Sequence, residues 1–121
     1  MIKRLELTWI HETSDESIGK YVQNKIGRLD RFIPRRDRGA VHVKVCLKKV
    51  KAADNRRYIC EIILYLPGGI VLKTEEASLN TYAAIDISES KLKAQLLKHR
   101  QQHSNPRIYH KIFSKFNRAA Y

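Results

Sequence analysis

The chain has 121 residues, 43% of them hydrophobic, and its 24 Lys plus Arg exceed its 12 Asp plus Glu to give a formal net charge of +12. This length suits a single domain, and no run approaches the roughly 18 to 20 apolar residues that a membrane span requires. Lys3, Arg4 and Glu6 lie at the N-terminus with no long apolar segment after them, so we expect no signal peptide and a cytoplasmic protein.

The charge excess favours a polyanionic partner, because each cation placed on a phosphate releases condensed counterions. A membrane surface is the other polyanion to consider, and a basic but passive surface is a third possibility. The cations are unevenly distributed, since no acidic residue follows Glu89. We therefore expect a nucleic-acid partner rather than a passive surface.

The first elements are a strand and a helix. Residues 1–10 alternate, with Leu5, Leu7 and Trp9 on one face of a half-buried strand. Thr13, Ser14 and Asp15 are all competent N-caps, and Thr13 has capping-box spacing with Glu16. The helix that follows carries one apolar stripe and is expected to end at a proline; these residues are Ile18, Val22, Ile26, Leu29, Ile33 and Pro34.

Three further strands follow an exposed, basic loop at residues 34–39. A period of two over residues 41–48 and 58–66 predicts two strands with one wet face each, joined by a polar connector at 51–56. This pattern puts Cys60 on the core face and Cys46 on the open face, so we expect two reduced cysteines. A turn at residues 67–69 precedes a last strand at 70–75.

From about Leu79 the period returns to that of a helix, which is expected to run to about Gln102, before Asn105-Pro106. Its expected buried stripe is Tyr82, Ile85, Leu92 and Leu96. Residues 1–103 are thus predicted to form one α+β domain, a β-α-β-β-β-α sandwich of two layers, with a four-stranded sheet covered by two helices on one face. Residues 104–121 form a separate basic, aromatic tail in which a short amphipathic helix is possible.

The basic side chains of the two helices lie off the apolar stripes, and those of the loop at 34–39 extend the same surface. Two helices side by side on one sheet would bring them onto one outer face. Solvated surfaces usually mix both signs of charge, whereas this set does not. The candidate RNA-binding residues are Lys20, Lys25, Arg28, Arg31, Arg35, Arg36, Lys91, Lys93, Lys98 and Arg100.

Such a surface suits recognition of folded RNA through its backbone, since the A-form major groove is too narrow for side chains to read. Base stacking on the sheet is not expected, because only Tyr65 could face outward from the middle strands.

Catalysis has little support in the sequence. His99 and His103 have the spacing of four that can hold a metal on a helix, but no third ligand accompanies them. Glu75 and Glu76 are adjacent on a strand and point to opposite faces, so they cannot act as a pair. No nucleophile motif is present. We expect no enzyme, cofactor, metal or small-molecule substrate.

Several segments, taken in order, resemble the ribosome hibernation-promoting factors, also known as ribosome-associated inhibitors or sigma-54 modulation proteins. Tyr82-Ala83-Ala84-Ile85-Asp86, followed by Lys91-Leu92, Gln95-Leu96 and Lys98, is similar to that family's last helix. Asp15, Ile18, Tyr21-Val22, Lys25-Ile26 and Arg28-Leu29 resemble its first helix, and Leu66-Pro67-Gly68-Gly69 its Leu-Pro-Gly turn. The resemblance covers about residues 1–103.

The resemblance implies a fold similar to double-stranded-RNA-binding domains. It also implies binding at the decoding region of the small ribosomal subunit, on 16S rRNA, where the protein would sterically block mRNA and tRNA. The family's rRNA-contacting positions fall on Lys25, Arg28, Arg31, Lys91 and Lys98. Off the ribosome the protein is expected to be monomeric, with no membrane partner.

The chain departs from the family at Leu79-Asn80, where Asp is common, and at Lys93-Ala94, where Glu-Arg is common. Because the sequence ends at Tyr121, it looks like a short form without the dimerisation domain of long members. A general structured-RNA-binding module, such as an RNA chaperone or assembly factor, is the alternative. A small RNA-cleaving or metal-dependent enzyme is the third hypothesis.

Overall fold

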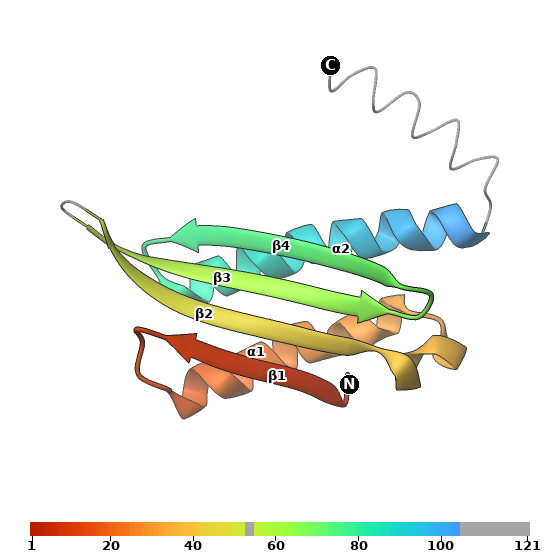
Figure 1. Cartoon of the computed structure of the whole chain (residues 1–121), viewed down its shortest axis with the longest axis horizontal. Coiled ribbons are helices and arrows are strands. Elements are labelled where there is room, and N and C mark those ends of the chain that lie inside the picture. Colours follow the sequence, from red (N-terminus) through yellow and green to blue (C-terminus); the bar gives the residue numbers. More distant parts are fainter. Residues whose placement is uncertain (53–54, 105–121) are drawn as a thin grey trace, which may run out of the picture.

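The computed structural model describes residues 1–52 and 55–104. Its elements follow the predicted order, with two short 3₁₀ helices added between the first helix and the second strand (Figure 1). They are β1 (Arg4–Ile10), α1 (Glu16–Gly27), η1 (Arg28–Phe32), η2 (Arg35–Ala40), β2 (His42–Ala52), β3 (Asn55–Leu66), β4 (Ile70–Ser78) and α2 (Thr81–Ser104). The tail beyond residue 104 and the helix considered for it lie outside the described residues.

The four strands form one sheet in the order β1-β2-β3-β4. β2 pairs antiparallel with β3, and β3 with β4, whereas β1 pairs parallel with β2, with Arg4 opposite His42 and Ile10 opposite Lys48. The pattern of the sequence alone does not predict the direction of β1 relative to β2. A helical crossover separates β1 from β2 and returns the chain to the end of the sheet where β1 began, which permits parallel pairing.

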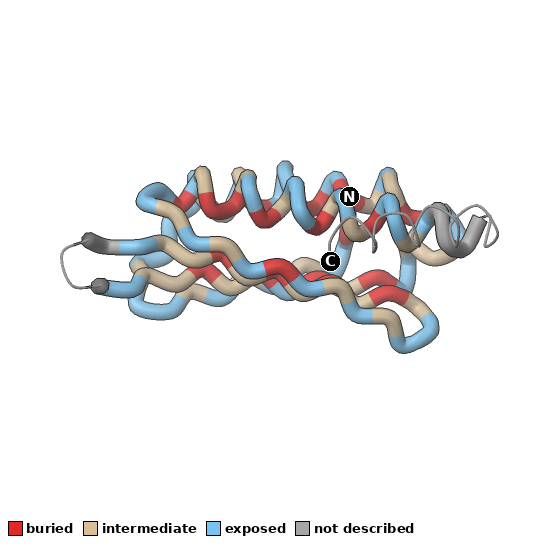
Figure 2. Tube along the Cα trace, turned by 90° about the horizontal axis from the view of Figure 1, so that it is seen from above, coloured by how far each residue is buried: buried red, intermediate tan, exposed pale blue. Residues whose placement is uncertain are grey.

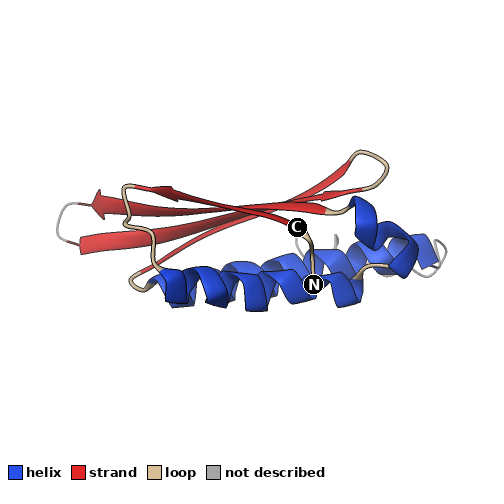
Figure 3. Ribbon diagram, turned by 90° about the horizontal axis from the view of Figure 1, so that it is seen from below, coloured by secondary structure: helices blue, strands red, loops and turns tan. Residues whose placement is uncertain are grey.

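Both helices cover the same face of the sheet, and the core lies between the two layers (Figures 2 and 3). Alternate residues of the central strands point into this core, as the period of two predicted. The fully buried strand residues include Val43, Val45, Leu47, Cys60, Ile62 and Leu64. Val22 and Ile26 meet them from α1, and Ile85, Leu92 and Leu96 from α2. The predicted α+β sandwich is confirmed.

Each long helix begins at a side-chain cap. Asp15 Oδ1 accepts hydrogen bonds from the backbone N–H groups of Ser17 and Ile18, at 2.8 and 3.2 Å, so Asp15 is the N-cap among the three candidates. Asn80 Oδ1 accepts from the N–H of Tyr82 at 2.7 Å. These bonds satisfy backbone donors that a helix start leaves without partners. α2 begins at Thr81, two residues after the predicted start at Leu79.

The structure corrects several local expectations. α1 ends at Gly27, and its last predicted turn is the 3₁₀ helix η1. The basic loop forms η2, where Arg38 Nε donates to the carbonyl oxygens of Asp30 and Ile33 at 2.9 and 3.0 Å. The polar connector at 51–56 belongs largely to β2 and β3. In the predicted buried stripe of α2, Tyr82 is exposed. The stripe begins instead one residue earlier, at Thr81, and it includes Ser88.

Candidate nucleic-acid interface

The helices α1 and α2 run side by side in the same direction on the sheet. Residues later in α1 contact residues later in α2. The ring centroids of Tyr21 and Tyr82 lie 4.9 Å apart in an edge-to-face contact, and Lys25 Nζ lies 3.6 Å from Asp86 Oδ1. Further on, Lys93 Nζ lies 5.1 Å from the ring centroid of Phe32. The C-terminal ends of the two helices consequently lie at the same end of the molecule (Figure 3).

Phe32 brings together two cations from separate elements. Arg31 Cζ lies 4.9 Å from its ring centroid, and Lys93 Nζ from α2 approaches the same ring. A cation over an aromatic face is stabilised by the ring quadrupole, which offsets part of the repulsion between the two charges. Arg31 also lies shortly after the C-terminal end of α1, whose partial negative charge favours nearby cations. Arg31 and Lys93 therefore form the centre of a basic surface built from η1 and α2.

Further arginines surround this centre. Arg28 directly follows α1, and Arg35 and Arg36 belong to η2; all three are exposed. Arg36 and Arg100 line a cleft of about 470 Å³ together with Phe32. We call this set the helix-end cluster: Arg28, Arg31, Arg35, Arg36, Lys93 and Arg100. It contains six of the ten predicted residues.

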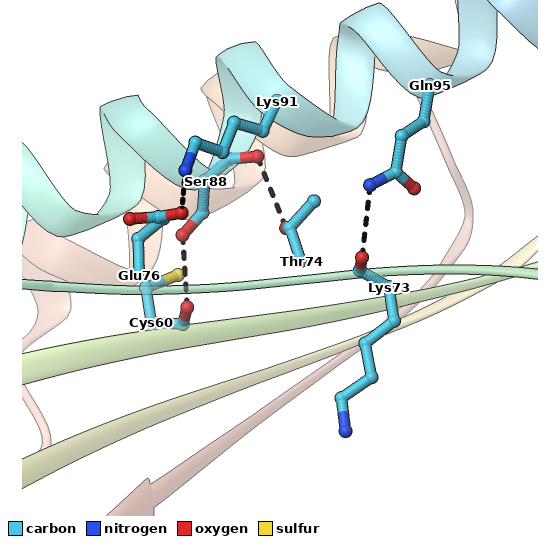
Figure 4. A network of polar contacts seen from close by, with 7 residues as sticks. All are labelled: Cys60, Lys73, Thr74, Glu76, Ser88, Lys91 and Gln95. Carbon is cyan, nitrogen blue, oxygen red and sulfur yellow. Dashed lines mark hydrogen bonds and ion pairs between the residues drawn. The ribbon is translucent and has the colours of Figure 1, made fainter. Parts of the chain in front are cut away.

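The remaining predicted cations of α2 lie on its other flank. Lys91 forms an ion pair with Glu76 of β4, and the adjacent turn is tied to β4 by Gln95 Nε2, which donates to the carbonyl oxygen of Lys73 at 3.1 Å (Figure 4). Lys98 follows Lys91 by seven residues, which is close to two helical turns and therefore the same flank. Lys91 and Lys98 are therefore exposed on the flank of α2 nearer β4, apart from Lys93.

The predicted cations of α1 have acidic neighbours. Lys20 is exposed and lies 3.5 Å from Glu16 one turn earlier, while Lys25 lies beside Asp86. Asp86 also accepts a hydrogen bond from the Tyr21 hydroxyl, which raises the pKa of Tyr21 to about 12, with smaller contributions from burial and the carboxylate charge. The N-terminal halves of the helices are therefore closer to charge balance than their C-terminal ends.

The structure also shows a ring pair on the open sheet face that sequence reasoning missed. His42 of β2 stacks on Tyr65 of β3 with centroids 5.5 Å apart and planes inclined by 28°, and Lys44 Nζ lies 5.8 Å from the Tyr65 ring. The period of two places both rings on the open face. Only the register between β2 and β3, which sets His42 opposite Tyr65, brings them together.

Metal and membrane sites find no support in the part of the chain that the structure describes. No group of three His, Cys, Asp or Glu side chains is placed to hold a metal ion there. None of the described helices is both long and apolar enough to cross a membrane.

A family model described as "Sigma 54 modulation protein / S30EA ribosomal protein" matches residues 5–104. This chain belongs to that family. The resemblance drawn from the two helices and the Leu-Pro-Gly turn is thereby confirmed. The family description names ribosomal and modulation proteins rather than an enzyme, in agreement with the expectation that the chain is not an enzyme.

Known proteins with similar sequences or structures show how far the likeness extends. The chain is 30% identical over 97 residues to a ribosome hibernation promotion factor of Staphylococcus aureus (strain COL), covering 80% of this chain and 48% of the relative. It therefore spans about half the length of that curated relative.

Two solved structures match the fold. The N-terminal domain of Protein Y from Thermus thermophilus superposes with a TM-score of 0.65 at 27% identity, covering 79% of this chain and 98% of that one. A ribosomal subunit interface protein from Coxiella burnetii gives a TM-score of 0.63 at 18% identity, covering 80% and 97%. The second likeness concerns the fold alone.

Proposed function

We propose that this protein is a ribosome-associated translation inhibitor that binds 16S rRNA in the decoding region of the small subunit. It acts by occupying the space of mRNA and tRNA, without a chemical step. The family's description as a ribosomal protein and the similarity to a ribosome hibernation promotion factor support the ribosome as partner. Such a protein works in the cytoplasm, as a monomer when off the ribosome.

The observation that carries this proposal is the meeting of Arg31 and Lys93 on Phe32. η1 and α2 each contribute a cation to one ring, and the neighbouring segments add the exposed arginines Arg28, Arg35 and Arg36, with the acidic residue Asp37 beside them. Cations fixed on a rigid sandwich can follow the phosphates of folded RNA without reading bases. Lys25 is a weaker candidate, because its ammonium is already paired with Asp86.

Co-sedimentation with purified small subunits tests the proposal. Wild-type protein should bind at moderate salt, lose affinity as salt increases, and be displaced by mRNA together with tRNA. A variant carrying Arg28→Gln, Arg31→Gln and Lys93→Gln should bind much more weakly. Failure of the wild-type protein to bind small subunits would overturn the proposal. Equal affinity for arbitrary duplex RNA and for ribosomes would instead support the structured-RNA-binding module.

A further inference from the structure

The hairpin of β2 and β3 extends beyond the rest of the sheet. β1 ends opposite Lys48, and β4 ends opposite Tyr58, whereas β2 and β3 continue to pair through Val50–Arg57, Lys51–Arg56 and Ala52–Asn55. Figure 1 shows this two-stranded segment projecting past the ends of β1 and β4. We call residues 49–52 and 55–57 the β-ribbon.

The β-ribbon and its base carry cations on both faces. Lys49 and Lys51 share the parity of the core-facing residues of β2, so they lie on the helix side; Lys48 lies on the open side. Arg57 also lies on the open side, since Tyr58 next to it shares the face of Cys60. A strand pair with positive charge on both faces can contact phosphates on either side of it.

These cations have no acidic partner in the described part of the chain. Lys48, Lys49, Lys51 and Arg57 form none of the ion pairs found there, in contrast to Lys25 and Lys91. Lys49 Nζ instead lies 5.7 Å from the ring centroid of Tyr58, its partner across the strand pair. Like charges gathered without compensation repel one another and disfavour the folded state. A polyanion would remove this repulsion on binding.

An open hollow lies beside these lysines. It is lined by His11, Lys49, Val50 and Lys51, and Val50 is 40% exposed within it. His11 follows β1 and adopts a positive φ of 56°, which turns the chain away at the base of the β-ribbon. The surface there places two lysines beside a small apolar area, and such cations can contact the phosphates of a sugar-phosphate chain.

The β-ribbon and the helix-end cluster lie at opposite ends of the sheet. η2 leads directly into His42, the first residue of β2, while Lys51 is nine residues further along the same strand. At roughly 3.3 Å per residue, the two basic sites are about 30 Å apart. Figure 3 shows the 3₁₀ helices and the hairpin at the two ends of the molecule.

We propose that the β-ribbon is a second phosphate-binding site that lies between RNA backbones, so that the protein holds ribosomal RNA at two points about 30 Å apart. This inference rests on the proposed function and adds a partner surface to it. Exposed lysines also protect unpaired strand edges from aggregation. Edge protection requires no RNA contact. If the lysines bind phosphates, their neutralisation should weaken RNA binding, whereas if they only protect the strand edges, RNA binding should not change.

The experiment compares the 121-residue wild-type protein with two variants of equal net charge in salt-dependent binding to purified small subunits. The ribbon variant carries Lys49→Gln, Lys51→Gln and Arg57→Gln. The control variant carries Lys3→Gln, Arg4→Gln and Lys73→Gln, which removes the same charge outside both sites. Circular dichroism and light scattering first verify that each protein is folded and monomeric.

The ribbon variant should bind more weakly than the control variant. Its slope of log K against log salt should be shallower than that of the control by about 2 to 3, which is close to one phosphate contact for each cation lost. A ribbon variant that matches the control in affinity and slope would overturn the inference while leaving the proposed function intact. Absence of binding by the wild-type protein would instead be a failure of the proposed function.

A second measurement locates the contact. A hydroxyl-radical probe attached at Val50→Cys, in a Cys46→Ser background, should cleave rRNA at a site distinct from that cleaved by a probe at Ala40→Cys, the last residue of η2. Cleavage from Ala40→Cys alone would overturn the β-ribbon as a contact.

Discussion

Tyr21 on α1 donates its hydroxyl hydrogen bond to Asp86 on α2, and this bond joins the two helices on which the candidate interface depends. Asp86 also pairs with Lys25, and the Tyr21 ring packs against Tyr82. The Asp86 carboxylate of α2 thus contacts two side chains of α1, Tyr21 and Lys25. It holds them in parallel alignment and at the same time neutralises a cation that could otherwise contact RNA.

Tyr21→Phe should lower the free energy of unfolding by about 1 kcal/mol, since a part-buried hydrogen bond to a carboxylate is lost while the ring remains. The pKa of Tyr21 is raised to about 12 from its usual 10. Between these values the folded state keeps a proton that the unfolded chain releases, so wild-type stability should fall as pH rises from 10 to 12. Urea unfolding across this range should show a smaller loss for Tyr21→Phe.

Lys93 and Lys91 are two residues apart on α2 and should differ in their effect on RNA binding. Lys93 lies over Phe32 in the helix-end cluster, whereas Lys91 is paired with Glu76 on the opposite flank. Lys93→Gln should weaken binding to small subunits and make the salt dependence shallower by about 1. Lys91→Gln, which removes the same charge, serves as the matched control and should change binding less. Equal losses would contradict this division of the helix.

The sequence predicted the layers of the fold but not how they align. Alternation over residues 41–48 identified the buried face of β2, because a half-buried strand repeats every two residues. Register depends on pairing with distant strands, so neither the parallel pairing of β1 nor the His42–Tyr65 stack could be deduced. Residues 51–56, which include much of the β-ribbon, were predicted to be a connector because most of them are polar or charged.

Helix periodicity had a similar limit at the candidate site. It placed Lys91 and Lys93 off the apolar stripe, but a residue outside the stripe can lie on either flank. Which flank faces α1 depends on how α2 lies against β4, where Lys91 meets Glu76. Phe32 was missed as well, because a single aromatic residue near a helix end carries no sign of the two cations around it.

Ser88 is a buried polar residue of α2 whose contacts hold the helix onto the sheet (Figure 4). Its Oγ donates to the carbonyl oxygen of Cys60 at 3.0 Å, and its own carbonyl oxygen accepts from Thr74 Oγ1 at 3.3 Å. Ser88→Ala should cost about 1 kcal/mol in thermal or urea unfolding, while Ser88→Leu should cost more because the site is fully packed. A more stable Ser88→Leu variant would contradict this view of the helix contact.

The two cysteines should report separately on the folded state, because they lie on opposite faces of the sheet. Cys60 is fully buried, and burial raises its pKa to about 12, so little reactive thiolate exists at pH 8. Burial also raises the pKa of Cys46, which is only partly covered on the open face. A thiol-reactive dye at pH 8 should therefore label Cys46 slowly in the native protein and reach Cys60 only on unfolding. In a Cys46→Ser variant, labelling should follow the opening of the core. If that variant reacts as fast in buffer as in denaturant, then α2 does not shield β3 as the structure shows.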